Sequence, residues 1–103
     1  MTTVRYDPDR YRLLVEGHAG SAPAGEDLVC AAASILGWTL VANAERYNAE
    51  IFLENGVIEV KCAPEDGREA LCREMMDTLA TGFKLLAEKQ QEYITMGGDT
   101  NGL

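Results

Sequence analysis

The sequence predicts an α+β sandwich in which antiparallel β-hairpins form a sheet and two main helices cover it. Three observations predict this class: two strand-like runs near the start, an Asn-Gly pair between two later runs, and two long helical segments. The expected order of elements is therefore strand, strand, helix, strand, strand, helix (ββαββα). The chain has 103 residues, the size of one domain, and we expect residues 1–103 to fold as one unit.

The first hairpin is expected over residues 2–16. Residues 2–6 and 11–16 are the strand-like runs. Asp7-Pro8-Asp9 between them has turn chemistry, because proline fixes φ and aspartate caps its own backbone. The small residues that follow, with the run S-A-P-A-G-E, predict a mobile loop.

A long apolar helix is expected from Asp27, as its N-cap, to about Arg46. Residues 28–44 carry no charge, but this segment is shorter than the roughly 20 residues that a membrane span needs. We therefore expect a buried helix and no membrane partner. Because one small sheet cannot cover a helix that is apolar nearly all round, the segment also predicts a homodimer.

The second hairpin and the second helix complete the expected fold. Residues 50–54 and 57–62 are the strands, and Asn55-Gly56 predicts a type I′ turn between them, since both residues tolerate positive φ. A long helix follows Gly67, and its buried face is predicted from apolar residues at mostly three- and four-residue spacings: Leu71, Met75, Leu79, Phe83, Leu86 and Tyr93. Residues 97–103 are expected to be a disordered tail.

The charge of the chain limits its partners. The formal net charge is -8, which argues against nucleic-acid binding and against an anionic membrane surface, because both need a basic face. A basic protein or peptide partner is permitted. The odd number of cysteines and the lack of a recognisable signal peptide favour free thiols in the cytoplasm.

His18 and Cys30 are the residues that favour catalysis. His18 follows a strand and precedes the loop, and Cys30 falls in the first turn of the expected helix. Free N–H groups and the helix dipole favour a thiolate there, an adjacent imidazole would accept the proton, and the same amides could bind an oxyanion. The alternative is that Cys30 is a small core residue and His18 an ordinary surface residue.

The three cysteines and the histidine leave two further alternatives. Together they could form a zinc site, but they lack the paired spacing of structural zinc ligands. Cys62 and Cys72 are interpreted as ordinary thiols, at a strand end and on a helix. A redox pair would require these two thiols to lie close in space.

The run Gly17-His18-Ala19-Gly20, followed by Gly25-Glu26-Asp27-Leu28-Val29-Cys30-Ala31-Ala32-Ala33-Ser34, resembles the signature of the Prp family, the ribosomal-processing cysteine proteases of bacteria. The family pattern is G-H-A, a variable loop, then G-x-D-[IVL]-V-C-A-[AG]-x-S. The resemblance implies a homodimeric cysteine protease that needs no cofactor. Its expected substrate is the short N-terminal extension of a large-subunit ribosomal protein, cleaved after aromatic residues.

The resemblance also assigns roles to individual residues. His18 stands where the family has its general base, and Cys30 where it has the nucleophile. Asp27 and Ser34 match the Asp and Ser of the motif, and their own chemistry favours supporting roles. Asp27 would be an N-cap, and the Ser34 hydroxyl would bond the Cys30 carbonyl or a neighbouring element. Three glycines would let the loop close over a bound peptide: Gly17, Gly20 and Gly25.

The expected reaction is acyl transfer, with His18 taking the Cys30 proton and returning it to the leaving amine. Two other classes of function remain open. One is a non-catalytic, ribosome-associated interaction module with the same fold, and the other is a thiol-based redox or metal protein.

Overall fold

The computed structural model describes residues 1–17 and 24–97, and the side chains of residues 1–17 and 28–97. In chain order the strands are β1 (Thr2–Asp7), β2 (Arg12–Gly17), β3 (Glu50–Glu54), β4 (Val57–Lys61) and β5 (Ile94–Met96). The helices are α1 (Ala24–Ala44) and α2 (Glu69–Lys89), with short 3-10 turns at Pro8–Arg10 and Glu45–Tyr47. The predicted α+β class is confirmed.

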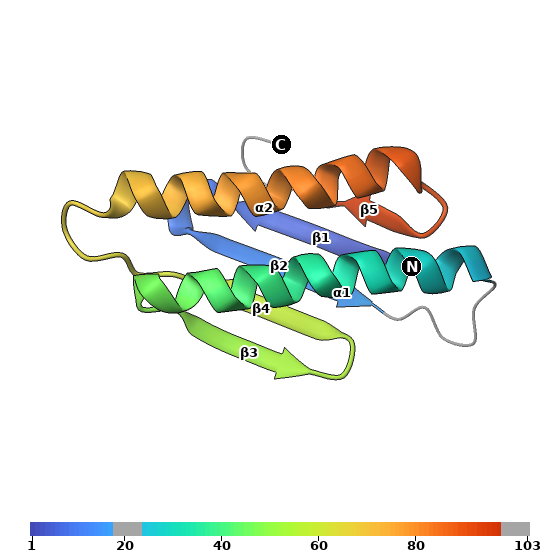
Figure 1. Cartoon of the computed structure of the whole chain (residues 1–103), viewed down its shortest axis with the longest axis horizontal. Helices are drawn as coiled ribbons and strands as arrows, with labels where there is room; N and C mark the ends of the chain where they lie inside the picture. The colour runs from blue at the N-terminus through green and yellow to red at the C-terminus, as the bar shows by residue number, and fades with distance from the viewer. Residues whose placement is uncertain (18–23, 98–103) are drawn as a thin grey trace.

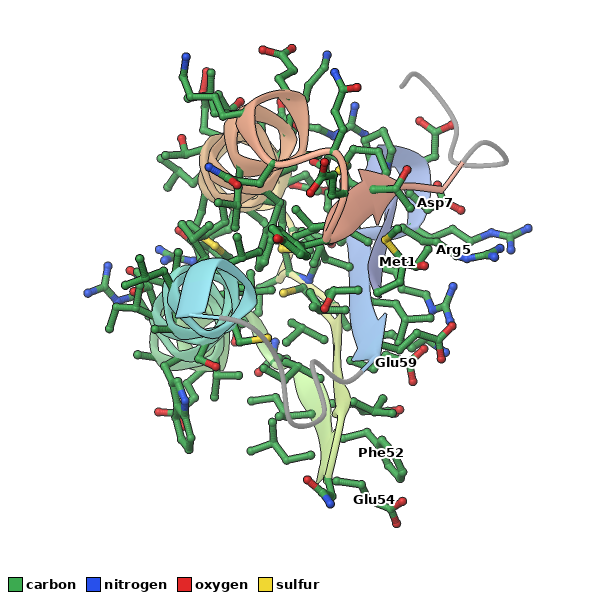
Figure 2. The ribbon with its side chains drawn as sticks, turned by 90° about the vertical axis from the view of Figure 1, so that its right-hand side faces the viewer. Met1, Arg5, Asp7, Phe52, Glu54 and Glu59 are labelled. Carbon is green, nitrogen blue, oxygen red and sulfur yellow. The ribbon has the colours of Figure 1, made fainter. Side chains whose placement is uncertain are left out.

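One five-stranded sheet runs in the order β3-β4-β2-β1-β5. Both helices lie on the same face of this sheet, as Figure 1 shows. The core fills the space between the helices and that face, and its largest fully buried members include Phe83, Leu13 and Leu40. Neither α1 nor α2 covers the other face, where the side chains of Arg5, Phe52 and Glu59 point away from the two helices in Figure 2.

The first hairpin forms as the sequence predicts. β1 and β2 pair antiparallel from Thr2 opposite Gly17 to Asp7 opposite Arg12. The Asp7 carboxylate accepts a hydrogen bond of 3.2 Å from the Asp9 N–H, which is the expected aspartate turn. Tyr11 closes the turn with a left-handed φ of 53°.

The second hairpin is confirmed in position, but its predicted turn type is wrong. β3 and β4 pair antiparallel with Glu54 opposite Val57, so Asn55 and Gly56 are the two loop residues. Of these two residues only Gly56 has a positive φ, of 83°. A type I′ turn needs positive φ at both positions, and glycine alone supplies the backbone freedom here.

The start of α1 differs from the sequence prediction. The helix begins at Ala24, so Asp27 lies inside its first turn and is not the N-cap. The helix dipole favours an acidic residue anywhere in the first turn, so the charge of Asp27 alone does not identify the first residue of the helix. Gly25, expected in the flexible loop, is likewise part of the helix. Of the predicted loop, residues 18–23 lie outside the described residues.

Within the described chain, α1 is buried on one face only, as expected for an apolar helix that one small sheet cannot cover. Val29, Leu40 and Ala44 are buried against the core, while Leu28, Ile35 and Trp38 are 73%, 63% and 61% exposed. By length and apolar composition alone the segment Leu28–Tyr47 could cross a membrane, a property that core helices of soluble proteins share. The exposed apolar face of α1 therefore lacks a cover within the described chain.

The buried face of α2 is rotated from the predicted stripe. Leu79 and Phe83 are buried as expected, but Leu71 is 54% exposed. Met75 and Leu86 are partly buried, and Tyr93 follows the helix, which ends at Lys89. The buried positions are Cys72, Met76, Leu79, Ala80, Phe83 and Ala87. Small residues and a cysteine make up half of this face, so large apolar residues alone did not identify it.

β5 is an additional strand that the sequence did not predict. Ile94–Met96 pairs in parallel with β1, so the sheet is mixed and not wholly antiparallel. The Thr2 N–H donates to the Tyr93 carbonyl at 2.8 Å, and the Gly97 N–H donates to the Val4 carbonyl at 2.6 Å. The predicted disordered tail, residues 97–103, lies outside the described residues except for Gly97.

Candidate active site

A pocket of about 710 Å³ lies between α1 and the β3–β4 hairpin. Strand ends from the middle of the sheet close its inner side. Its lining residues come from every one of these elements: Thr2, Val15, Gly17, Cys30, Ala33, Ser34, Trp38, Leu53, Glu54, Asn55, Gly56, Val57 and Ile58. The pocket is large enough to hold one or two amino-acid side chains of a peptide.

One stripe of α1 faces the pocket. Cys30, Ser34 and Trp38 follow each other at intervals of four residues, which places them one above the other on the helix surface. Cys30 is partly exposed, and Trp38 lies at the border between the pocket and the exposed apolar face of the helix. The thiol is therefore reachable from solvent, and a large aromatic side chain lines the same pocket about two helical turns away.

The β3–β4 hairpin supplies the opposite, apolar wall. Leu53 and Ile58 lie directly across from each other in the register of the two strands. Side chains alternate between the two faces of a sheet, so these two residues share the helix side. Phe52 and Glu54 point to the opposite side, as Figure 2 shows. The polar residues that the hairpin adds to the lining are Glu54, at the end of β3, and Asn55 in the turn.

Gly17 is a close-packed glycine at the inner side of the pocket. It has a φ of +130°, and a Cβ placed there would lie 2.2 Å from the Met1 carbonyl oxygen. Its N–H donates to the Gly56 carbonyl at 2.8 Å, which ties the end of β2 to the turn of the second hairpin. His18 is the next residue in the chain and lies outside the described residues, as does Gly20.

The three thiols differ sharply in their surroundings. Of the three cysteines, all within the described part of the chain, Cys30 is the one that lines the pocket. Cys62 and Cys72 are buried, and burial raises the pKa of the Cys62 thiol to about 12. Burial also raises the pKa of the Cys72 thiol. A deprotonated, solvent-accessible nucleophile is therefore not available at Cys62 or Cys72.

The position of Cys30 within the helix differs from the sequence prediction. Cys30 is the seventh residue of α1 and not the third, because the helix begins at Ala24. The N–H groups without an intrahelical partner belong to the first turn of α1, about one turn before Cys30. An oxyanion held by the helix start would therefore lie on the N-terminal side of the thiol.

Ser34 and the zinc alternative can also be compared with the structure. Ser34 is exposed in the pocket and makes no hydrogen bond with any residue of the described chain, so the expected bond to the Cys30 carbonyl is absent. Within residues 1–17 and 24–97, no three His, Cys, Asp or Glu side chains come together as metal ligands.

Trp38, Leu53, Asn55 and Ile58 are pocket residues that the sequence analysis did not identify. Trp38 could have been found from its four-residue spacing with Cys30 and Ser34. The other three could not, because only the folded sheet brings the second hairpin to the same end of α1.

The model of the family described as "Cysteine protease Prp" matches residues 1–95. The chain is therefore a cysteine protease, and an accessible thiol in a peptide-sized pocket agrees with that class. It belongs to the Prp family.

Solved structures share the fold. An essential ribosomal processing protease Prp from S. aureus, in complex with a substrate peptide, is 20% identical with a TM-score of 0.77, covering 94% of this chain and 98% of that one. The same protease with a covalently linked product peptide is 21% identical with a TM-score of 0.75, again covering 94% and 98%. SMU.848 from Streptococcus mutans is 23% identical with a TM-score of 0.66, covering 92% of this chain and 89% of that one. The comparison with curated proteins finds no match.

Proposed function

We propose that this protease removes the short N-terminal extension of a large-subunit ribosomal protein, with Cys30 as nucleophile and His18 as general base. One observation carries the proposal: Cys30 is the cysteine that opens into the pocket, whereas Cys62 and Cys72 are buried. Gly17, at the end of β2, lines the same pocket, so the chain enters the His18 segment from beside Cys30. Nucleophile and base would thus come from two rigid elements, a helix and a strand end.

The proposed reaction is acyl transfer in two stages. His18 takes the thiol proton, and the Cys30 Sγ forms a bond to the peptide carbonyl carbon. The tetrahedral intermediate collapses as His18 gives the proton to the leaving amine, and the C–N bond breaks. Water, deprotonated by His18, then attacks the thioester carbonyl carbon. The C–S bond breaks, His18 returns the proton to the Cys30 Sγ, and the N-terminal peptide leaves with a new carboxylate.

The walls of the pocket suit a substrate with a large apolar side chain at the cleavage point. Trp38, Leu53 and Ile58 add aromatic and aliphatic surface to the pocket that holds the thiol, and a buried aromatic side chain removes about 150–250 Å² from solvent. The S. aureus relative has been crystallised with a substrate peptide, which supports a peptide as the ligand here. The net charge of -8 would attract the basic chain of a ribosomal protein.

The test is to incubate the purified protein with the full-length ribosomal protein of its host and to measure intact masses. The expected result is a processed protein whose mass is lower by that of the N-terminal extension. The last residue of the removed extension should be aromatic. A matched incubation with the His18→Gln variant should leave the substrate intact, since glutamine keeps a similar size but cannot act as the base.

Three other outcomes would contradict the proposal. If the protein binds the ribosomal protein but leaves its mass unchanged, it is an interaction module and not the proposed protease for this substrate. If the His18→Gln variant cleaves as well as the parent, His18 is not the base. Processing at a position after a charged residue would contradict the apolar role of Trp38 and its neighbours.

We further propose that the active protein is a cytoplasmic bacterial homodimer formed through α1. Leu28, Ile35 and Trp38 expose a continuous apolar strip along this helix, and a second copy of the same strip would cover it. Because Trp38 also lines the pocket, the second copy would lie beside the active site.

The dimer predicts a change of mass on substitution of one exposed residue. The parent should show twice its chain mass of 11.2 kDa by light scattering, and Ile35→Glu should shift it to the single-chain mass, since a buried charge without a partner opposes association. Leu85→Glu is the matched control, because Leu85 is 51% exposed on α2, away from that strip. A parent that remains at the single-chain mass at high concentration would contradict the proposed interface.

A further inference from the structure

Gly37 is a buried glycine in the middle of α1, on the side of the helix that faces the sheet. It follows Cys30 by about two helical turns, so the two residues lie on the same side of α1. A Cβ placed at Gly37 would be 2.5 Å from the Cδ1 atom of Ile58 on β4. Carbon atoms in contact lie about 3.5–4.0 Å apart, so the δ-methyl of Ile58 occupies the space that a side chain on Gly37 would need.

Ile58 is the middle residue of one wall of the pocket. In the register of the sheet it lies between Leu53 on β3 and Val15 on β2, and all three residues line the pocket. Side chains directly across from each other in a sheet share one face, so this row lies opposite α1. The tip of the Ile58 side chain lies against Gly37 and is thus drawn towards the helix.

We propose that Gly37 is a specificity-determining residue of the protease, which acts by positioning Ile58. The missing side chain lets the Ile58 δ-methyl lie against α1, and this keeps the pocket open to a large aromatic side chain at the residue whose carbonyl Cys30 attacks. The inference rests on the proposed role of Cys30, and not on the identity of the ribosomal-protein substrate.

A residue larger than glycine would push Ile58 into the pocket. Leu53 and Val15 flank its side chain along the sheet and α1 lies opposite, so the pocket is the open direction. The δ-methyl would have to move by at least about 1 Å to regain a normal contact distance. One methylene group more or less in an apolar pocket changes discrimination between substrates by about tenfold or more.

Close packing without any effect on the substrate is the alternative, and Gly82 on α2 provides the matched control. A Cβ at Gly82 would be 2.7 Å from the Leu36 Cδ2, which is the same kind of contact. Neither Gly82 nor Leu36 lines the pocket. Gly82→Ala should therefore disturb packing as Gly37→Ala does, but leave the preference for the substrate side chain unchanged.

The test measures how fast Cys30 reacts with two probes, the chloromethyl ketones of N-acetylphenylalanine and N-acetylalanine. Each probe alkylates the thiolate with loss of chloride, and intact mass follows the reaction without any ribosomal protein. The ratio of the two rates, divided by the ratio for glutathione, should favour phenylalanine in the parent. Gly37→Ala should lower this ratio by about tenfold, while Gly82→Ala keeps it within about threefold of the parent.

Ile58→Val tests whether the effect passes through Ile58. It removes the δ-methyl that the new Cβ would meet, so the double variant Gly37→Ala/Ile58→Val should regain the parent ratio within about threefold. Ile58→Val alone keeps the core nearly unchanged and can be measured even if Gly37→Ala does not fold. It leaves space beside Gly37, so the rate with a naphthylalanine probe should rise by about threefold relative to the phenylalanine probe.

Several results would overturn the inference. An unreactive Cys30, or a parent ratio equal to that of glutathione, would mean that the pocket does not receive an aromatic side chain beside the thiol. An unchanged ratio in Gly37→Ala, an equal fall in Gly82→Ala or no recovery in the double variant would remove the role of Gly37, as would an unchanged naphthylalanine rate in Ile58→Val. If all ratios are as expected but the ribosomal protein is not processed, the proposed substrate is wrong and the role of Gly37 stands.

Discussion

Cys30→Ala is expected to lower kcat/KM for the ribosomal-protein substrate by about 10⁴-fold or more. Without the nucleophile the enzyme can still bind the peptide and polarise its carbonyl group, but it cannot form the acyl-enzyme. The residue is small and the helix position suits alanine, so the fold should be retained. The measurement is the initial rate of extension removal, followed by intact mass, beside a circular dichroism spectrum and an unfolding curve of the same sample.

Cys62→Ala is the matched control for this prediction. It also removes one thiol, but from a buried position outside the pocket. Its rate should stay within about threefold of the parent, while its free energy of unfolding falls by about 1 kcal/mol for the lost sulfur contact. A folded Cys62→Ala chain without activity, or an active Cys30→Ala chain, would remove Cys30 from its proposed role.

Gly17→Ala is expected to have the largest effect on stability and to impair catalysis as well. An added Cβ would lie 2.2 Å from the Met1 carbonyl oxygen and 2.9 Å from the Thr2 Cα, and both are backbone atoms that cannot rotate away. The φ of +130° adds the strain of a conformation that side chains rarely adopt. Urea unfolding should show a loss of about 2–4 kcal/mol, together with a lower rate of cleavage.

Gly67→Ala is the control that isolates the backbone strain. Gly67 has a φ of +91°, but a Cβ there would meet no atom within 4 Å. The expected loss is about 1 kcal/mol, with cleavage unchanged, because this loop lies outside the pocket. Equal losses for the two variants would mean that the contact between Gly17 and the first strand contributes nothing.

The elements that the sequence predicted well are those with a local signal. The first hairpin needs only Asp7-Pro8-Asp9 between two short runs, and the second needs only Asn55-Gly56. β5 has no such signal: it consists of three residues, and its partner β1 lies at the opposite end of the chain. Pairing over such a distance depends on how the whole sheet assembles.

The candidate site was predictable only in part, for a similar reason. A motif with a recognisable family resemblance drew attention to Cys30 and Gly17, and both line the pocket. The wall formed by Leu53 and Ile58 comes from a hairpin that carries no motif, and its role follows from its position beside α1. The boundary of α1 was predicted too late, since Asp27 favours a first-turn position as well as an N-cap.

The parallel pairing of β5 with β1 has a consequence for synthesis of the protein. β1 is synthesised before both hairpins are complete, yet the strand that covers its outer edge, β5, follows α2. A nascent chain can build the two hairpins and α1 while β1 still presents unpaired N–H and C=O groups. The edge of the sheet at β1 is therefore covered only after α2 and β5 have left the ribosome, and until then it is open to pairing with another chain.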